Sequence, residues 1–191
     1  MKQVTSVLIV GVGGQGTLLA SRLLGNAMLS AGCDVKVSEV HGMSQRGGSV
    51  VTYVRYGDEV SSPIIEEGGA DYILAFEQLE AARFLAWLKP GGEMIVNSQA
   101  IDPMPVITGA AQYPQDLIAK IREKGVTLTD VDALALAEEA GSSKAVNVVL
   151  IGVLAKRMNL SYDAWVQTIR ETVPPKFVDM NRKAFDLGYQ K

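Results

Sequence analysis

The segment from Thr5 to Gly16 reads T-S-V-L-I-V-G-V-G-G-Q-G and indicates the fold class of the chain. Its first half is apolar and β-branched, which predicts a buried strand, and its glycines predict a tight loop. The next stretch, Thr17 to Gly32, carries leucine and alanine at helical spacing, so we expect a helix that begins near the Thr17 hydroxyl and stops at Gly32. The order strand, glycine loop, helix is typical of an α/β fold.

The glycine loop fits the pattern G-x-G-x-x-G, in which glycines permit a tight turn and let a phosphate approach the N-terminus of the helix. A turn needed only to pack the helix against the sheet would give the same pattern. The loop is therefore a candidate phosphate or nucleotide cradle, and both interpretations stay open on the pattern alone. Its candidate site residues are Gly11, Gly13, Gly14, Gln15 and Gly16.

Length and charge limit the classes of function. A chain of 191 residues, 48% of them hydrophobic, can bury a core, and we expect residues 1–191 to form a single domain. The net charge of −3 leaves no general basic field for nucleic acid. The longest apolar run, Ala145 to Ala155, is too short to span a bilayer, so we expect a cytoplasmic protein with no membrane partner.

Cysteine and histidine usage argues against a metal centre on this chain. Cys33 is the only cysteine and His41 the only histidine. One thiol cannot hold an iron-sulfur cluster, and a structural zinc site needs four nitrogen or sulfur ligands. We therefore expect no metal and no complete catalytic set here, and any redox centre must lie elsewhere.

A second strand is expected over Asp34 to Val40, and it contains an acidic residue, Glu39. Glu39 lies 23 residues beyond Gly16, where the acid of a dinucleotide-binding fold would hold the ribose. An ordinary polar residue at a strand end would occupy the same position. Spacing alone does not separate these two interpretations.

The loop that follows, His41 to Gly48, reads H-G-M-S-Q-R-G-G and combines glycines with polar donors. Loops after parallel strands meet at one edge of the sheet, so we expect this loop and the first glycine loop to face each other. The guanidinium of Arg46 there suggests an anionic partner, although lone arginines and histidines are often only solvated or structural. The candidate site residues of this loop are His41, Ser44, Gln45, Arg46, Gly47 and Gly48.

The remaining pattern continues the α/β alternation and then becomes helical. We expect a strand over 49–56 that continues into an antiparallel ribbon through 60–62, then strands over 70–76, 93–97 and 126–131 and helices over 77–88 and 115–124. Four further helices are expected over 133–140, 143–158, 162–173 and 176–187. The predicted fold is α/β and Rossmann-like, a mostly parallel sheet with helices on both faces and a helical C-terminal third.

Asn147 interrupts the apolar stretch A-V-N-V-V-L-I-G-V-L within one of these helices. A buried asparagine needs hydrogen-bond partners. It either ties down a neighbouring loop or contacts a cofactor or partner directly.

Two classes of function fit these observations. The first is a stand-alone nucleotide enzyme, either an NAD-dependent dehydrogenase or, given F-L-A-W-L-K-P-G-G-E-M-I-V at 84–96, a methyltransferase-like domain. A dehydrogenase also needs a proton-transfer group, and His41 has no obvious acidic partner. The second is a non-catalytic subunit that presents its two glycine loops to a cofactor held by another chain.

The paired motifs G-V-G-G-Q-G (11–16) and S-E-V-H-G-M-S-Q-R-G-G-S-V (38–50) resemble the gamma-type subunit of 2-oxoacid:ferredoxin oxidoreductases, and the second loop is most similar to that of indolepyruvate-type members. The resemblance covers nearly the whole chain. It continues through S-S-P-I-I (61–65), A-D-Y-I-L-A-F-E (70–77), Asn147 with Gly152, and P-P-K-F (174–177) with Asn181, Ala184, Phe185 and Gly188. Many members have a tyrosine-glycine-proline version of the second loop. Because this chain has H-G-M-S there, the identity of the 2-oxoacid substrate stays open.

The resemblance implies an accessory role in the oxidative decarboxylation of a 2-oxoacid to an acyl-CoA, with ferredoxin as acceptor and coenzyme A as co-substrate. It places thiamine diphosphate, magnesium and iron-sulfur clusters on partner subunits, in agreement with the lone cysteine and the lack of a G-D-G thiamine motif here. The glycine loop then shapes a subunit interface or an anion pocket for coenzyme A, rather than an NAD site. The resemblance implies cofactor-binding or interface roles for the candidate residues of both loops and for Asn147.

Overall fold

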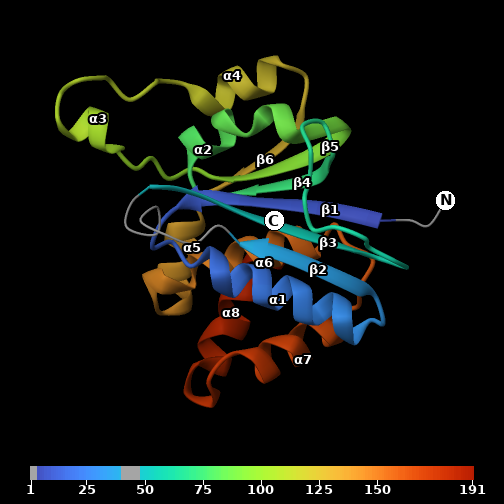
Figure 1. Ribbon diagram of the computed structural model, residues 1–191. Coiled ribbons are helices and arrows are strands. Elements are labelled where there is room, and N and C mark those ends of the chain that lie inside the picture. Colours follow the sequence, from blue (N-terminus) through green and yellow to red (C-terminus); the bar gives the residue numbers. More distant parts are fainter. Residues whose placement is uncertain (1–3, 40–47) are drawn as a thin grey trace.

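The computed structural model describes residues 4–39 and 48–191 (Figure 1). The strands are β1 (Val4–Val12), β2 (Asp34–Glu39), β3 (Ser49–Gly57), β4 (Ala70–Ala75), β5 (Leu88–Asn97) and β6 (Thr127–Val131). The helices are α1 (Thr17–Ser30), α2 (Gln78–Arg83), α3 (Met104–Ile107), α4 (Leu117–Glu123), α5 (Ala133–Ala140), α6 (Val146–Ala155), α7 (Tyr162–Thr172) and α8 (Val178–Tyr189). Short 3-10 turns occur at Leu85–Trp87, Ser143–Ala145 and Pro175–Phe177.

The strands form one sheet in the order β2-β3-β1-β4-β5-β6. The pairs β1 with β4, β4 with β5 and β5 with β6 are parallel, whereas β3 is antiparallel to both of its neighbours, β1 and β2. Among the described strands, β3 alone therefore runs against the others. The predicted mostly parallel sheet is confirmed.

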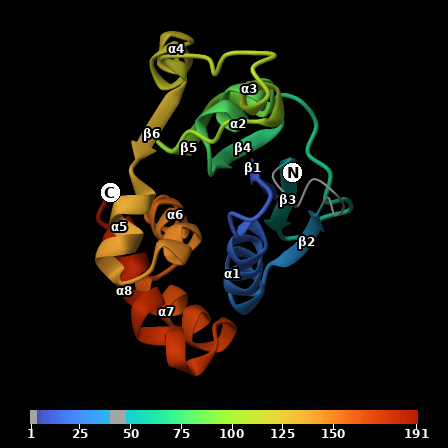
Figure 2. The ribbon, with the colours of Figure 1, turned by 90° about the vertical axis from the view of Figure 1, so that its left-hand side faces the viewer.

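Helices cover both faces of the sheet, as the sequence predicts. Figures 1 and 2 show α2, α3 and α4 on one face and α1 with α5 to α8 on the other. Each face has its own core: Leu8 and Met94 belong to the first, and Leu150, Trp165 and Phe185 to the second. Strand β1 is buried over residues 6–11 because helices cover it from both sides, which explains its nearly unbroken apolar sequence.

Helix α6 is buried along its whole length, and its closest neighbour is α8. The two helices approach so closely that glycine is required at the crossing. A Cβ atom at Gly152 would lie 2.3 Å from the Phe185 carbonyl oxygen, and one at Gly188 would lie 2.0 Å from the Val149 carbonyl oxygen. These two glycines therefore set the distance between α6 and α8.

The predicted ribbon after β3 is wrong. Residues 60–62 form no strand, and both edges of β3 are already paired, with β1 on one side and β2 on the other. A strand with both edges occupied has no free backbone groups for a third partner. The chain instead crosses to β4 as an irregular segment.

The region around K-P-G-G also differs from the prediction. Helix α2 ends at Arg83, and β5 begins at Leu88, so residues 89–92 lie inside the strand instead of ending a helix. The pairing of β5 with β4 shifts register between Ala70 and Tyr72, which accommodates the glycines there. Residues 98–114, which lie outside the predicted helices and strands, contain the short helix α3. The helices of the C-terminal third lie where the sequence predicts them, within a few residues at their ends.

Helix α1 begins without help from a side-chain hydroxyl. Gly16 is its N-cap residue, no side-chain hydrogen bond caps the helix, and Thr17 is buried inside it. None of the helices within 4–39 and 48–191 is long and apolar enough to cross a membrane.

We predict that Gly152→Ala and Gly188→Ala each lower the free energy of unfolding by about 2 to 3 kcal/mol, because the added methyl group must separate two packed backbones. The matched control is Gly25→Ala in α1, where a Cβ atom would only reach van der Waals contact, 3.7 Å from the Val37 side chain. That control should be neutral or stabilising by up to about 1 kcal/mol. Urea denaturation followed by circular dichroism measures all three, and equal effects would contradict the proposed role of the crossing.

Candidate functional site

The candidate site lies at the edge of the sheet where β1, β4 and β5 end and β3 begins. Val12 of β1 pairs with Ser49 of β3, and the next residue outward, Gly13, donates its amide hydrogen to the Gly48 carbonyl oxygen at 2.9 Å. The described end of the second loop therefore touches the first glycine loop, as predicted. The two loops meet for a different reason than predicted. They do not follow adjacent strands, because β3 lies between β2 and β1, and the contact is made by Gly48, directly before β3.

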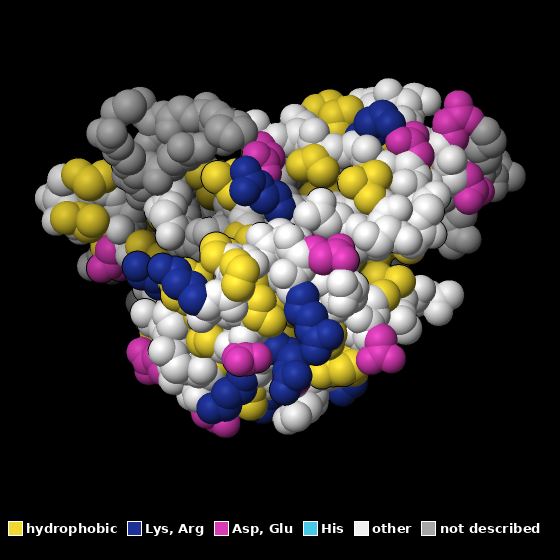
Figure 3. All heavy atoms as spheres, turned by 90° about the horizontal axis from the view of Figure 1, so that it is seen from below, with side chains coloured by type: hydrophobic (Ala, Val, Ile, Leu, Met, Phe, Trp, Pro, Cys, Tyr) yellow, Lys and Arg dark blue, Asp and Glu magenta, His cyan; other side chains and the backbone are white. Residues whose placement is uncertain are grey.

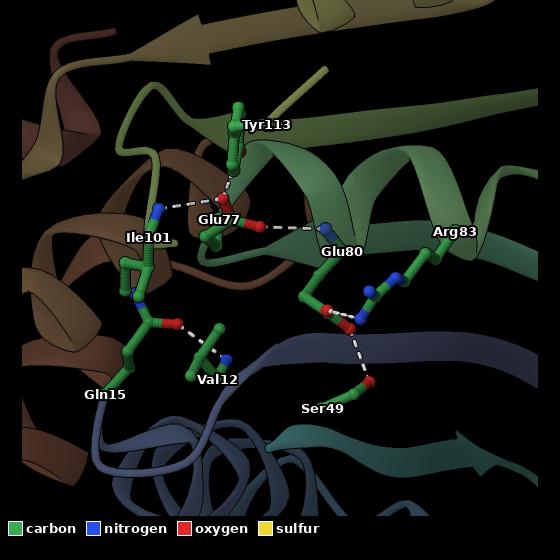
Figure 4. Close-up of polar contacts among 8 residues, drawn as sticks. All are labelled: Val12, Gln15, Ser49, Glu77, Glu80, Arg83, Ile101 and Tyr113. Carbon is green, nitrogen blue, oxygen red and sulfur yellow. Dashed lines mark hydrogen bonds and ion pairs between the residues drawn. The ribbon is translucent and has the colours of Figure 1, made fainter. Parts of the chain in front are cut away.

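Gln15 closes the glycine loop with its own side chain (Figure 4). Its Oε1 accepts a hydrogen bond from the Val12 amide at 2.8 Å, and its Nε2 donates to the Phe76 carbonyl oxygen at 3.0 Å. One side chain thus joins the ends of β1 and β4. Gln15 is one of the predicted site residues, and its side chain serves the loop's own structure.

Asn97 extends this amide network to β5 and α5. Its Nδ2 donates to the same Phe76 carbonyl oxygen at 3.1 Å, and its Oδ1 accepts from the Ala133 amide at 3.1 Å. Gln99 Oε1 lies 3.3 Å from both Gln15 Nε2 and Asn97 Nδ2. The strand ends are therefore held together by side-chain amides, which satisfy backbone groups that the sheet leaves unpaired.

Asn147 holds the other side of the loop. Its Nδ2 donates to the Gly16 carbonyl oxygen at 3.2 Å, and its Oδ1 accepts from the Val148 amide at 2.9 Å. Gly16 has φ +82°, and a Cβ atom there would lie 2.6 Å from Asn147 Nδ2. These bonds support the interpretation that Asn147 ties down a neighbouring loop.

Sequence reasoning missed two buried carboxylates beside this loop, Glu77 and Glu80. Glu77 is the N-cap of α2: its Oε2 accepts from the Glu80 amide at 2.9 Å. Its Oε1 accepts from the Ile101 amide at 3.1 Å and from the Tyr113 hydroxyl. Burial, together with the bond to the Glu77 carboxylate, raises the pKa of Tyr113. The detectable signal was the spacing of two glutamates at the start of a helix.

The Glu80 side chain extends from α2 to the start of β3 (Figure 4). Its carboxylate pairs with Arg83 Nη1 at 2.6 Å and accepts a hydrogen bond from the Ser49 hydroxyl. Its side chain is 2% exposed, whereas that of Arg83 is 45% exposed. The pair therefore reaches from the core to the surface.

Two cavities flank the glycine loop. The first, about 270 Å³, lies beside α2. It is lined by Val12, Gly48, Ser49, Glu77, Leu79, Glu80, Arg83, Ile101, Pro103, Met104 and Pro105. The second, about 500 Å³, lies between Gly14–Gly16 and the start of α6, with Ser143 and Lys144 on its wall. The N-terminus of α1 and the Lys144 ammonium at the second cavity favour an anion there.

The geometry disfavours the dinucleotide interpretation. The Gly13 and Gln15 amides already bond to the Gly48 and Val12 carbonyl oxygens, which removes donors that a pyrophosphate would need. Glu39 accepts a hydrogen bond from the Ser21 hydroxyl at 2.6 Å, and β3 separates its strand from β1. It therefore lies one strand further out than the ribose-binding acid of a dinucleotide fold.

Several predicted site residues are not placed. His41, Ser44, Gln45, Arg46 and Gly47 lie outside the described residues. Within residues 4–39 and 48–191, no group of three or more histidine, cysteine, aspartate or glutamate side chains is arranged to hold a metal ion.

Comparison with known proteins gives consistent matches over the full chain. The sequence profile of the pyruvate ferredoxin/flavodoxin oxidoreductase family matches residues 6–191. The chain is 49% identical over 188 residues to indolepyruvate oxidoreductase subunit IorB of Pyrococcus horikoshii, covering 96% of this chain and 93% of that protein. It is 27% identical over 187 residues to the pyruvate/ketoisovalerate oxidoreductases common subunit gamma of Thermococcus kodakarensis, covering 95% and 93%.

Solved structures share the fold. Pyruvate oxidoreductase subunit PORC from Thermotoga maritima superposes with a TM-score of 0.76 at 21% identity, covering 100% of this chain and 97% of that one. A 2-oxoglutarate:ferredoxin oxidoreductase chain from Magnetococcus marinus superposes with a TM-score of 0.73 at 21% identity, covering 100% of this chain but 31% of that one. In that protein the same fold is one part of a larger chain.

We predict that Asn147→Asp lowers the free energy of unfolding by about 1 to 3 kcal/mol, because a carboxylate cannot donate to the Gly16 carbonyl oxygen and leaves that group unpaired. The control is Asn26→Asp, which makes the same atomic change at an exposed position where Asn26 bonds to Thr172. It should change stability by less than about 0.5 kcal/mol. If urea denaturation finds the two variants alike, the Asn147 contact does not hold the loop.

Proposed function

The chain belongs to the pyruvate ferredoxin/flavodoxin oxidoreductase family, and from this premise we propose that it is the accessory, non-catalytic subunit of a 2-oxoacid:ferredoxin oxidoreductase. The observation that carries the proposal is the 49% identity to subunit IorB over nearly the whole length of both chains. An arylpyruvate such as indolepyruvate is accordingly the substrate that we propose for the complex.

In the proposed reaction, a 2-oxoacid, coenzyme A and two oxidised ferredoxins give an acyl-CoA, CO₂, two reduced ferredoxins and a proton. The iron-sulfur clusters would reside on partner subunits, because the single cysteine of this chain cannot ligate a cluster. Thiamine diphosphate with magnesium would reside there too, because this chain has no G-D-G thiamine motif. The complex would act in the cytoplasm.

The edge built around the glycine loop is the part of this chain that we propose faces the catalytic subunit. The amides of Gln15 and Asn97 and the buried Asn147 hold this edge in one conformation. A rigid edge loses little conformational entropy on binding, which favours a stable subunit interface. This supports the proposal that the edge binds the catalytic subunit and takes no part in the chemical reaction.

Coenzyme A is proposed to reach this chain at the cavity beside Lys144. The cavity of about 500 Å³ combines the N-terminus of α1 with an exposed ammonium, and both attract phosphate. Ser143 adds a hydroxyl to the same wall. The chain would then help to hold the phosphates of the co-substrate while the reacting thiol lies in the partner.

We predict that the purified chain alone is colourless and does not reduce a viologen dye with any 2-oxoacid, whereas addition of the thiamine-binding subunit restores coenzyme A-dependent dye reduction. Iron analysis, visible absorbance and a panel of 2-oxoacids that includes indolepyruvate and pyruvate measure this. A brown preparation of the chain alone, or micromolar binding of NAD by calorimetry, would count against the proposal and favour a stand-alone enzyme.

We also predict that Lys144→Ala raises the KM of the reconstituted complex for coenzyme A by roughly tenfold, the equivalent of one lost charge-assisted contact. The KM for the 2-oxoacid should not change. Lys124→Ala removes an exposed lysine at the end of α4, on the other face of the sheet, and serves as the control. An unchanged KM for coenzyme A in Lys144→Ala would exclude this cavity as the phosphate site.

A further inference from the structure

The hydrogen bonds at the sheet edge fix the orientation of three side-chain amides in turn. The Val12 amide donates to Gln15 Oε1, and the Ala133 amide donates to Asn97 Oδ1. Because a backbone N–H group can only donate, each of these two side chains turns its oxygen toward the backbone and keeps its NH₂ group for other partners. Gln15 Nε2 and Asn97 Nδ2 then both donate to Gln99 Oε1 at 3.3 Å.

Gln99 therefore has one orientation, in which its oxygen faces these two donors and its NH₂ group faces away from them. The opposite orientation would bring three NH₂ groups together, donor against donor. The backbone of Gln99 is held as well, because its carbonyl oxygen accepts from the Gln78 amide at 3.1 Å. The Gln99 NH₂ group makes no hydrogen bond to any residue within 4–39 and 48–191. It is thus a fixed donor that the described residues leave free.

Gln99 lines the cavity of about 500 Å³ beside Lys144. None of the residues that line this cavity is acidic. Within the described part of the chain, neither the Ser143 hydroxyl nor the Lys144 ammonium on the same wall has a hydrogen-bond partner. The wall therefore carries several free donors and no carboxylate that would compete for them.

The charge around this cavity favours an anion. The N-terminus of α1 lies on its wall at Gly16, and the first amide groups of a helix carry partial positive charge. The cavity lies on the side of the sheet that α1 and α5 to α8 cover. Figure 3 looks at that side and shows lysine and arginine side chains gathered there. A phosphate group, with its negative charge and several acceptor oxygens, matches this set of donors.

We infer that Gln99 is a binding residue for coenzyme A, an inference that rests on the proposed function. Its NH₂ group donates to a phosphate oxygen of the co-substrate, beside the contact made by Lys144. Gln99 is neutral, so its contribution is direction: a donor that is already fixed in one orientation loses little conformational entropy on binding. The same side chain joins the co-substrate to Gln15 and Asn97, at the edge that is proposed to face the catalytic subunit.

Gln99→Glu tests this role with almost no change in shape. A glutamate keeps one oxygen for Gln15 and Asn97 and places a second, negatively charged oxygen where the NH₂ group was. We expect the KM of the reconstituted complex for coenzyme A to rise by roughly ten- to a hundredfold, because a donor is replaced by a repelling charge. The kcat at saturating coenzyme A, the KM for the 2-oxoacid and the melting temperature should stay close to those of the parent.

The matched control is Gln112→Glu, which makes the same atomic change at an exposed residue between α3 and α4, on the other side of the sheet. It should leave both KM values unchanged. If Gln99→Glu raises both KM values alike, or melts well below the control, then Gln99 only holds the loop and the binding role is overturned.

Gln99→Met separates the hydrogen bond from the charge. Methionine has a similar length but neither an NH₂ group nor a charge, so we expect a smaller rise in the KM for coenzyme A, about three- to tenfold. It also loses the acceptor for Gln15 and Asn97, so its melting temperature should fall, whereas that of Gln99→Glu should not. An unchanged KM for coenzyme A in Gln99→Met would overturn the role as donor.

Failure of this inference can be distinguished from failure of the proposed function. If this chain and the thiamine-binding subunit together give no coenzyme A-dependent dye reduction, the proposed function fails. If Lys144→Ala raises the KM for coenzyme A and Gln99→Glu does not, the phosphate site stands and the role of Gln99 alone is overturned. If neither variant raises it, the cavity is not the phosphate site, and the inference falls with it.

Discussion

The hydrogen bond between Asn147 and the Gly16 carbonyl joins two parts of the chain that are far apart in sequence, the glycine loop and the helical C-terminal third. Helix α6, which carries Asn147, is buried along its length, so a polar side chain there must find a partner. Because Gly16 lacks a Cβ atom, the loop can approach the asparagine closely enough to provide that partner. This contact holds the end of the glycine loop, where α1 begins, against α6.

The hydrogen bonds at the sheet edge distinguish this G-x-G-x-x-G loop from the loop of a dinucleotide-binding fold. In a dinucleotide-binding fold, the loop amides stay free for a pyrophosphate. Here Gln15 bonds within the loop and to Phe76, and Gly13 bonds to Gly48. The loop is rigid without a ligand, and the cavities that remain lie on either side of it.

Strand β3 accounts for most of the difference from a simple doubly wound sheet. It enters between β1 and β2 and runs antiparallel to both. This insertion moves Glu39 away from the glycine loop and brings Ser49 beside it, where Ser49 bonds to the buried Glu80. The ribose-binding corner of a dinucleotide fold is thus replaced here by β3, whose first residue, Ser49, lines the cavity beside α2.

The sequence by itself determined the strand, glycine loop and helix at the N-terminus, the mostly parallel sheet and the helical C-terminal third, because apolar periodicity and glycine spacing are local signals. It indicated the family through the resemblance of its two loop motifs. Only the tertiary structure decided which strands are neighbours, that residues 89–92 belong to a strand, and that Glu77 and Glu80 reach the site. Those outcomes depend on contacts between residues distant in sequence, such as Glu77 with Tyr113 and Asn147 with Gly16, and no local pattern encodes them.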